Sequence, residues 1–97
     1  MSVKQSSELE IVTVLQALAD PVRLEMVRQL ADCESELSCG QIEVPVTKST
    51  ATHHLKVLTR AGITAEREEG TRKYMRLRCS ELDQRFPGLI DSVLRAG

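Results

Sequence analysis

Two adjacent histidines, His53 and His54, lie in the segment VTKSTATHHLKVLTRAGI (46–63), among small side chains that carry hydroxyl groups. Such a pair could bind a metal ion, act as catalytic bases, or lie on the polar face of a helix. Neighbouring residues on a helix point about 100° apart, whereas helical histidines that share one metal ion are three or four positions apart. The pair alone therefore predicts no metal site.

A helix over this segment would have two distinct faces. One face is mostly apolar and consists of Ala51, His54, Leu55, Leu58 and Ala61. The other carries donors for phosphate oxygens and base edges, namely Lys48, Ser49, Thr52, His53 and Lys56. We expect His54 to be partly buried and bonded to a backbone group or helix end. His53 is expected to belong to a binding surface, with an ordinary solvated face as the alternative.

Three cysteines, Cys33, Cys39 and Cys79, offer thiol chemistry without metal-binding spacing. An odd number without the pairing of a zinc ribbon is typical of simple thiols in a reducing compartment. We expect Cys39 to be a buried small hydrophobe, and Cys33 and Cys79 to be open to reaction. Sulfurs that converge could bind a soft ion such as arsenite or form a disulfide that moves the hairpin. A thiol enzyme that uses Cys39 with His53 or His54 lacks a third orienting group, so we expect no enzymatic activity.

Charge is segregated along the chain, although the net charge is only −1. Residues 1–46 contain three basic and eight acidic side chains, a balance of −5, whereas residues 47–78 contain eight basic and three acidic ones, a balance of +5. The basic part can attract the phosphates of nucleic acid. The chain is nearly without aromatic residues, which would stack on the bases of a single strand, so we expect the nucleic acid to be duplex DNA.

No apolar run approaches the roughly 20 residues of a membrane span, and the N-terminus lacks a signal-peptide core. We therefore expect a cytoplasmic protein without membrane association.

The elements that must position these residues begin with two short helices. Ser7 and Glu10 resemble a capping box, which predicts a first helix over about residues 8–19 after a flexible tail over residues 1–6. Asp20-Pro21 predicts the start of a second helix over residues 22–31, since aspartate can cap free N–H groups and proline loses no hydrogen bond at the first helical position. Residues 32–38 are expected to form a polar connection, and CGQI (39–42) a short helical turn.

The histidine segment is predicted to be helical from Thr47 or Lys48 to Ala61, with Gly62 as its C-terminal cap. Residues 63–78 then change to the period-two pattern of a β-hairpin with Glu69-Gly70 at its tip. Cations crowd this hairpin and glutamates partly offset them: Arg67, Arg72, Lys73, Arg76 and Arg78 against Glu66, Glu68 and Glu69.

Ser80 is predicted to cap a last helical stretch, which Pro87-Gly88 interrupts before LIDSVLRA (89–96). The resulting order is α-α-α-α-β-β-α. This order predicts a single winged helix-turn-helix domain over residues 1–97, mainly α with a β-hairpin wing.

Three stretches resemble the ArsR/SmtB family of bacterial winged-helix repressors: LADPVRLEMVRQL (18–30), STATHHLKVLTRAGI (49–63) and REEGTRKYMRL (67–77). The resemblance implies a homodimer that places two recognition helices on a palindromic operator in double-stranded DNA. The DNA contacts that it implies by position are Lys48, Ser49, Thr52 and His53, supported by Thr50 and Lys56, with Arg72 and Lys73 in the wing. It also implies a subunit interface between the first and last helices. Apolar residues of those helices fit that role: Ile11, Leu15, Leu89, Ile90, Val93 and Leu94.

The chain departs from the sensing motifs of this family. ELSCGQI (36–42) has Ser38 and Gly40 where metal-sensing relatives have two cysteines, and the last helix has no histidine. We therefore expect no resident metal or cofactor. Release of DNA by a thiol-reactive or metalloid effector, through Cys33, Cys39 or Cys79, is left open. The alternative function is a winged helix that binds another protein and no DNA.

Overall fold

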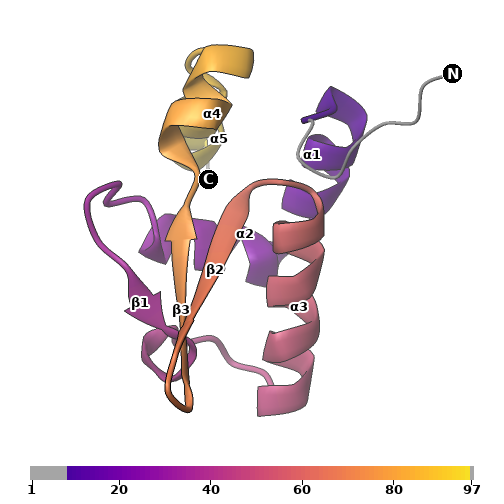
Figure 1. Cartoon of the computed structure of the whole chain (residues 1–97). Coiled ribbons are helices and arrows are strands. Elements are labelled where there is room, and N and C mark those ends of the chain that lie inside the picture. The colour runs from indigo at the N-terminus through magenta and orange to yellow at the C-terminus, as the bar shows by residue number, and fades with distance from the viewer. Residues whose placement is uncertain (1–8, 97) are drawn as a thin grey trace, which may run out of the picture.

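The computed structural model describes residues 9–96, which form five α-helices, a 3₁₀ turn and a three-stranded antiparallel sheet (Figure 1). In chain order the elements are α1 (Ile11–Leu18), α2 (Pro21–Gln29), β1 (Leu37–Ser38), the 3₁₀ turn η1 (Cys39–Gln41), α3 (Lys48–Arg60), β2 (Thr64–Glu69), β3 (Arg72–Leu77), α4 (Cys79–Arg85) and α5 (Leu89–Ala96). The tail predicted over residues 1–6 and Ser7 of the predicted capping box lie outside the described residues.

The molecule has two ends with different contents (Figure 1). The N-terminus of α3 and the tip of the β2–β3 hairpin lie together at the lower end of the view. The helices α1, α4 and α5 lie at the upper end. The predicted winged helix-turn-helix arrangement is confirmed, with η1 and α3 as the helix-turn-helix pair and β2–β3 as the wing.

The first two helices differ in how well their starts were predicted. Asp20 caps α2 as expected: its Oδ1 accepts hydrogen bonds from the N–H groups of Val22 (2.8 Å) and Arg23 (3.1 Å). The predicted start of the first helix at residue 8 is wrong, because α1 begins at Ile11, with Glu10 at the N-cap position and no side-chain cap bond. The second helix ends at Gln29, two residues before the predicted end.

The sheet contains a strand that the sequence did not reveal. Within the predicted connection 32–38, Leu37 pairs with Met75 and Ser38 with Tyr74, so the sheet has the order β1-β3-β2. A two-residue strand is too short to show a periodic pattern. The hairpin turn itself has two residues, Gly70 and Thr71, and the positive φ of Gly70 (62°) is what a glycine at the first position of a type II′ turn provides.

The core is aliphatic and draws on nearly every element. Helices contribute side chains three or four positions apart, and β3 contributes Met75 and Leu77 at a spacing of two. The largest fully buried side chains are Val14, Met26, Val27, Leu30, Leu58, Ile63, Thr64, Met75 and Leu82. Burial of these side chains is the main source of stability for a chain of this size.

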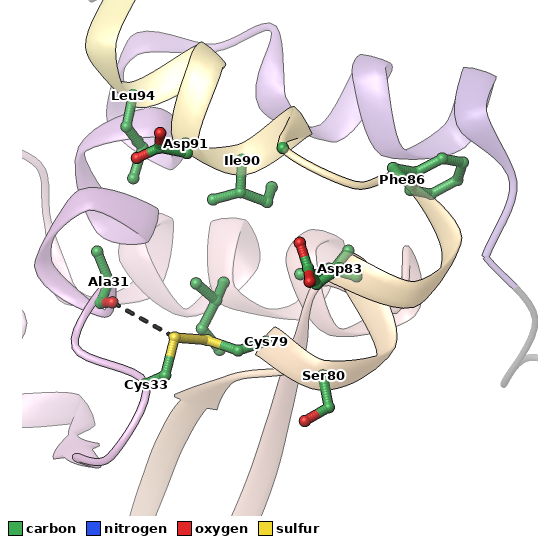
Figure 2. Close-up of a pocket in the computed structure, with 12 residues that line it drawn as sticks. Ala31, Cys33, Cys79, Ser80, Asp83, Phe86, Ile90, Asp91 and Leu94 are labelled. Atoms are coloured by element: carbon green, nitrogen blue, oxygen red, sulfur yellow. Dashed lines mark hydrogen bonds between the residues drawn. A yellow bond between two sulfur atoms is a disulfide. The ribbon is translucent and has the colours of Figure 1, made fainter.

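Cys33 and Cys79 form a disulfide, with 6.0 Å between their Cα atoms (Figure 2). Two of the three sulfurs therefore converge, so the disulfide that the sequence left open is present, and the alternative of three simple thiols is wrong. The bond joins residues 46 positions apart, and closing such a ring stabilises the fold by about 4 kcal/mol in the chain-entropy description. Cys39 is free and half-buried against the core, so its expected role as a small hydrophobe holds in part.

The C-terminal region follows the predicted outline with one correction. Pro87-Gly88 does separate two helical stretches, α4 and α5. Ser80 does not cap the first of them, because α4 begins at Cys79 and its N-cap residue, Arg78, makes no side-chain cap bond. The predicted N-cap residue was therefore two positions too late in the chain.

Substitution of Gly62 tests how tightly the C-terminus of α3 is built. Gly62 has a φ of 86°, and a Cβ at this position would overlap the Leu9 side chain. We expect Gly62→Ala to lower the free energy of unfolding by about 1–3 kcal/mol, measured by urea denaturation. Gly40→Ala is the matched control, because a Cβ there meets no atom within 4 Å and the change should cost less than about 0.5 kcal/mol. Equal stabilities of the two variants would contradict this explanation.

Candidate nucleic-acid interface

The helix α3 is divided lengthwise into a buried and an exposed side. Leu55 and Leu58 are buried, and Ala51 and His54 are half-buried beside them. Arg60 at the C-terminal end is exposed, and so are six polar side chains before it: Lys48, Ser49, Thr50, Thr52, His53 and Lys56. These six side chains are the α3 ridge below. The predicted orientation of the helix faces is confirmed, and the two histidines do point to different surroundings.

The first turn of α3 is polar and carries no acidic residue. Thr47 caps it, since its Oγ1 accepts from the N–H of Thr50 (3.3 Å) and its hydroxyl donates to Thr50 Oγ1 (3.0 Å). Lys48 adds a positive charge next to the helix N-terminus, whose free N–H groups already favour anions. The start of the α3 ridge is therefore suited to phosphate.

His54 bonds to an arginine side chain, so the predicted backbone partner is wrong. Arg23 Nη1 of α2 donates to Nδ1 of His54 at 3.0 Å. Because arginine cannot accept, Nδ1 is unprotonated in this bond and the ring proton lies on Nε2. Arg23 Nε also donates to the Ala17 carbonyl oxygen at 2.6 Å. One guanidinium thus connects α1, α2 and α3, and sequence spacing gave no signal for it.

The cap residue Asp20 lies next to this arginine–histidine pair. Burial alone would raise the pKa of its carboxyl group. Hydrogen bonds from the N–H groups of Arg23 and Val22, together with the positive charge of the nearby Arg23 side chain, outweigh that effect and lower the pKa below its ordinary value. Asp20 therefore acts as an ionised cap.

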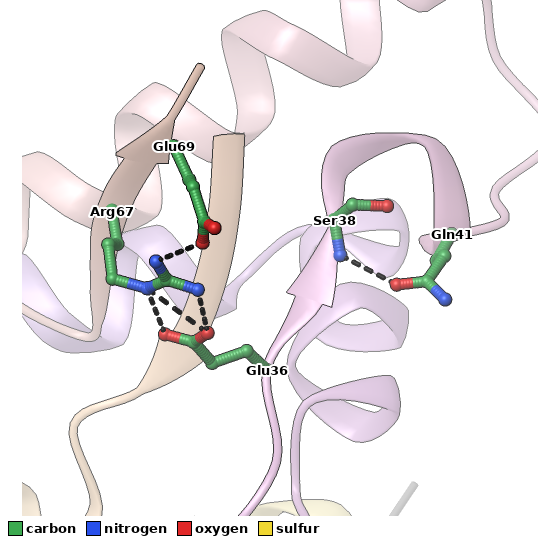
Figure 3. Close-up of polar contacts among 5 residues, drawn as sticks. All are labelled: Glu36, Ser38, Gln41, Arg67 and Glu69. Atoms are coloured by element: carbon green, nitrogen blue, oxygen red, sulfur yellow. Dashed lines mark hydrogen bonds and ion pairs between the residues drawn. The ribbon is translucent and has the colours of Figure 1, made fainter. Parts of the chain in front are cut away.

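The wing is less basic than its composition suggests, because several of its cations are paired. Arg67 donates to the Glu36 carboxylate (2.7 to 3.2 Å) and to Glu69 (2.8 Å) (Figure 3). Its guanidinium also lies 4.7 Å from the Tyr74 ring centroid. The hydrogen bond from Arg67 lowers the pKa of Glu36, and the two glutamates raise that of Arg67. Lys73 lies 3.5 Å from Glu66 and 4.0 Å from Glu68.

The three remaining cations of the wing, Arg72, Arg76 and Arg78, differ in whether their side chains face solvent or bond to the rest of the chain. Arg78 turns away from the tip, since its Nη1 donates to the Gly62 carbonyl oxygen at 3.1 Å. Of the five cations that the sequence places in the hairpin, Arg67 and Arg78 are therefore engaged within the chain, and the expected partial offset of charge by glutamates holds for Arg67. Within residues 9–96, Arg72 and Arg76 make no ion pair, and both are exposed. Arg76 was not among the predicted site residues, although its alternation with Arg72 and Tyr74 along β3 could have indicated it.

Apolar side chains remain uncovered at the end opposite the wing tip. Ile11, Val12 and Leu15 on α1 are 42%, 62% and 45% exposed. The helix α5 has no fully buried residue, and its apolar side chains are half-buried: Leu89, Ile90, Val93 and Leu94. Within residues 9–96 no helix has the length and apolarity needed to cross a bilayer, and no three metal-ligating side chains gather.

The chain is similar in sequence and in fold to known transcription regulators. Residues 18–67 match a family described as a helix-turn-helix domain. The chain is 35% identical over 95 residues to the uncharacterized HTH-type transcriptional regulator YceK of Bacillus subtilis, over 96% of this chain and 95% of YceK. HlyU of Vibrio cholerae has a similar structure, with a TM-score of 0.72 and 26% identity over 89% of both chains.

A second solved structure is similar in fold and has a described assembly. It is the homodimeric winged helix-turn-helix DNA-binding domain Mb0332 of Mycobacterium bovis, a possible ArsR-family transcriptional regulator. The TM-score is 0.69 at 28% identity, over 88% of this chain and 78% of that one.

The ionised cap at Asp20 leads to a pH-dependent prediction. We expect Asp20→Ala to lower the free energy of unfolding by about 1 kcal/mol at pH 7, whereas Asp20→Asn keeps a capping oxygen and most of the stability. Because the folded-state pKa is lowered, the contribution of the charge is present above the ordinary pKa of 3.8 and is lost as the pH falls through the folded value. The difference between wild type and Asp20→Ala should shrink in strong acid; a difference that grows on acidification would contradict the assignment.

Proposed function

The chain belongs to the ArsR-like winged helix-turn-helix transcriptional regulators, and from this premise we propose that it is a homodimeric repressor that binds a palindromic operator in duplex DNA. The observation that carries the proposal is the α3 ridge. It is exposed along one side of α3, and its N-terminal end lies at the same end of the molecule as the wing tip (Figure 1). A helix of this kind enters the major groove while the wing contacts the flanking backbone.

Each residue of the α3 ridge has a role that its chemistry supports. Lys48, Ser49, Thr52 and His53 contact base edges and phosphates at the N-terminal half of the helix. Thr50 is engaged by Thr47 and supports the first turn, and Lys56 supplies a phosphate contact one to two turns further along. In the wing, Arg72 is the principal phosphate contact. Lys73 assists it once DNA competes for the ammonium group that Glu66 and Glu68 now share.

The homodimer is supported by the apolar side chains that the isolated chain leaves uncovered. The exposed Ile11 and Leu15 of α1, and the half-buried Leu89, Ile90, Val93 and Leu94 of α5, lie at the end of the molecule away from the wing tip. A two-fold interface there would point both α3 ridges outward on the same side. Two half-sites about 34 Å apart, one turn of DNA, are the spacing that such a dimer needs.

Regulation completes the proposal. A thiol-reactive or metalloid effector would release the repressor from DNA by capturing Cys33 and Cys79 as free thiols and so preventing their disulfide from forming again. In this proposal residues 9–96 form the DNA-binding domain of a regulator that acts in the cytoplasm without a catalytic role.

A winged helix that binds another protein is the second candidate, and the paired cations of the wing favour it. Glu36, Glu66, Glu68 and Glu69 neutralise much of the positive charge around β2 and β3. A salt titration separates the two functions. A DNA-binding dimer loses affinity with a log–log slope of several units, because each neutralised phosphate contributes about −0.9. Absence of a duplex complex at low salt would favour the protein-binding function.

Substitutions on α3 test the DNA interface directly. We expect Lys48→Ala and His53→Ala each to weaken binding to the duplex upstream of the protein's own gene by about 1–3 kcal/mol, measured by fluorescence anisotropy. Lys56→Ala should weaken binding to all sequences alike, because a phosphate contact carries no base information. Arg95→Ala, which removes an exposed cation of α5, is the control and should leave binding unchanged.

Stability measurements on the same variants complete the test. Lys48→Ala and His53→Ala should unfold like wild type, since both side chains are exposed. If His53→Ala unfolds the protein while His54→Ala is harmless, the assigned faces of α3 are reversed and the proposed interface is wrong.

The proposed dimer interface is tested by a charge placed on its apolar surface. We expect Leu15→Asp to convert the dimer to a folded monomer in sedimentation equilibrium, because Leu15 is 45% exposed in the single chain but would be buried between two chains. Thr13→Asp adds the same charge to another side of α1, where Thr13 is exposed, and should stay dimeric. A monomeric wild type, or a dimeric Leu15→Asp variant, would contradict this interface.

A further inference from the structure

The disulfide Cys33–Cys79 encloses the whole DNA-binding unit in one covalent ring. The ring of residues 33–79 contains β1, η1, α3, β2 and β3, and with them every residue of the proposed DNA interface. The helices of the proposed dimer interface, α1 and α5, lie outside the ring. The bond therefore lies at the boundary between the part that contacts DNA and the part that sets the dimer.

Both sulfurs are within reach of small molecules. Cys33 is exposed and Cys79 is half-buried, and both line a cavity of about 450 Å³ between α4, α5 and the loop after α2. Figure 2 shows the disulfide at one wall of this cavity and Ile90 and Leu94 of α5 at another. The volume lies in the range of about 300–1,000 Å³ that is usual for small-molecule sites.

The surroundings of Cys33 suit the reduced state as well as the oxidised one. Its Sγ lies 3.6 Å from the carbonyl oxygen of Ala31 (Figure 2). In the disulfide this sulfur carries no proton, so the approach is only a contact. In the thiol, the S–H group would find that carbonyl as a ready acceptor, and reduction therefore leaves no unsatisfied donor at this position.

The disulfide is also a principal connection between α4–α5 and the rest of the molecule. Among the described side chains of these two helices only Leu82 is fully buried. The other connections are the packing of half-buried apolar side chains against the core, among them Phe86, Ile90 and Leu94, and two hydrogen bonds. Arg85 Nε donates to the Leu9 carbonyl oxygen (3.1 Å), and Arg28 Nη1 to that of Leu94 (3.0 Å). Breaking the S–S bond would leave α4–α5 held by this packing and these hydrogen bonds alone, so the two helices could move more readily relative to the DNA-binding unit.

We propose that Cys33 and Cys79 form a reversible thiol–disulfide exchange site for small-molecule thiols and their disulfides, and that the disulfide form binds operator DNA more tightly than the dithiol form. The effect on DNA rests on the proposed function; the exchange site does not. The tighter binding follows because the closed ring holds α4–α5, and thus the dimer, in one arrangement relative to the α3 ridge. The reduced form must order these parts when it binds.

The exchange proceeds in two balanced steps. A small thiolate attacks Sγ of the exposed Cys33, the Cys33–Cys79 bond breaks, and Cys79 leaves as a thiolate. A second small thiolate then displaces Cys33 from the mixed disulfide, forming the small-molecule disulfide. In total, two small thiols are oxidised, the protein disulfide is reduced by two electrons, and the two protons end on Cys33 and Cys79. The reverse steps reoxidise the pair with the small-molecule disulfide as oxidant.

Cys39 is not part of this site. It is half-buried against the core, and burial raises the pKa of its thiol, with Glu66 acting in the same direction. A thiol with a raised pKa contains less thiolate and exchanges slowly. This difference supplies a matched control, because Cys39→Ser removes a cysteine without touching the exchange pair.

The exchange site is tested with glutathione as the probe. The full-length protein is equilibrated in buffers of increasing glutathione disulfide content, quenched in acid, denatured and alkylated, and the alkyl groups are counted by intact mass. We expect the count to fall from three to one as the buffer becomes oxidising, since the chain has three cysteines and two of them pair. Cys79→Ser should accumulate a glutathione adduct at Cys33. A count that stays at one or at three in every buffer would overturn the exchange site.

The effect on DNA is measured with the same preparations and the duplex upstream of the protein's own gene. We expect the dithiol form to bind at least about fivefold more weakly than the disulfide form, the lower end of usual coupling between sites. Cys39→Ser should keep this difference, and the double variant Cys33→Ser/Cys79→Ser should bind weakly in both buffers. Equal affinities of the two wild-type forms would overturn the regulatory effect. Absence of binding in both states would contradict the proposed function and this effect together. The exchange site would still be tested independently, by the number of alkyl groups per chain.

Discussion

Burial of Leu55 and Leu58 determines how α3 is rotated about its own axis, and the rest of the interface depends on that rotation. Once these two side chains enter the core, His53 must face water, because a helix places it about 140–160° away from both leucines. The Arg23–His54 hydrogen bond adds a polar restraint to the same rotation and connects it to α1 and α2. The packing of apolar side chains in the core thus determines which polar side chains of α3 are exposed to solvent.

One end of the molecule carries the proposed DNA-binding surface, and the other end carries the proposed dimer interface. The N-terminus of α3 and the wing tip share one end, and the incompletely buried α1 and α5 share the other (Figure 1). Between them, Cys33–Cys79 is a covalent connection and Arg28 and Arg85 supply hydrogen-bonded ones. A change in these connections would alter how two α3 ridges are presented to DNA without altering the ridge itself. Regulation and recognition can therefore be separate properties of one small fold.

Features that depend on nearby residues could be predicted from the sequence, and features that depend on distant partners could not. Asp20-Pro21 and Gly62 act within a few residues of themselves, so their roles at helix ends were predictable. The faces of α3 followed from period alone. Glu36 and Arg67 are 31 positions apart, and Cys33 and Cys79 are 46 apart. Neither pairing has a local signal, and the free cations of the wing could be identified only after its ion pairs were known.

The central claim is that the α3 ridge is the surface that meets DNA. The most direct test is an NMR titration of ¹⁵N-labelled protein with the duplex upstream of its own gene, followed through the backbone amide shifts. We expect the largest changes at Lys48, Ser49, Thr52 and His53, with a second set around Arg72. Changes confined to α1, α4 and α5, with α3 unaffected at saturation, would contradict this claim.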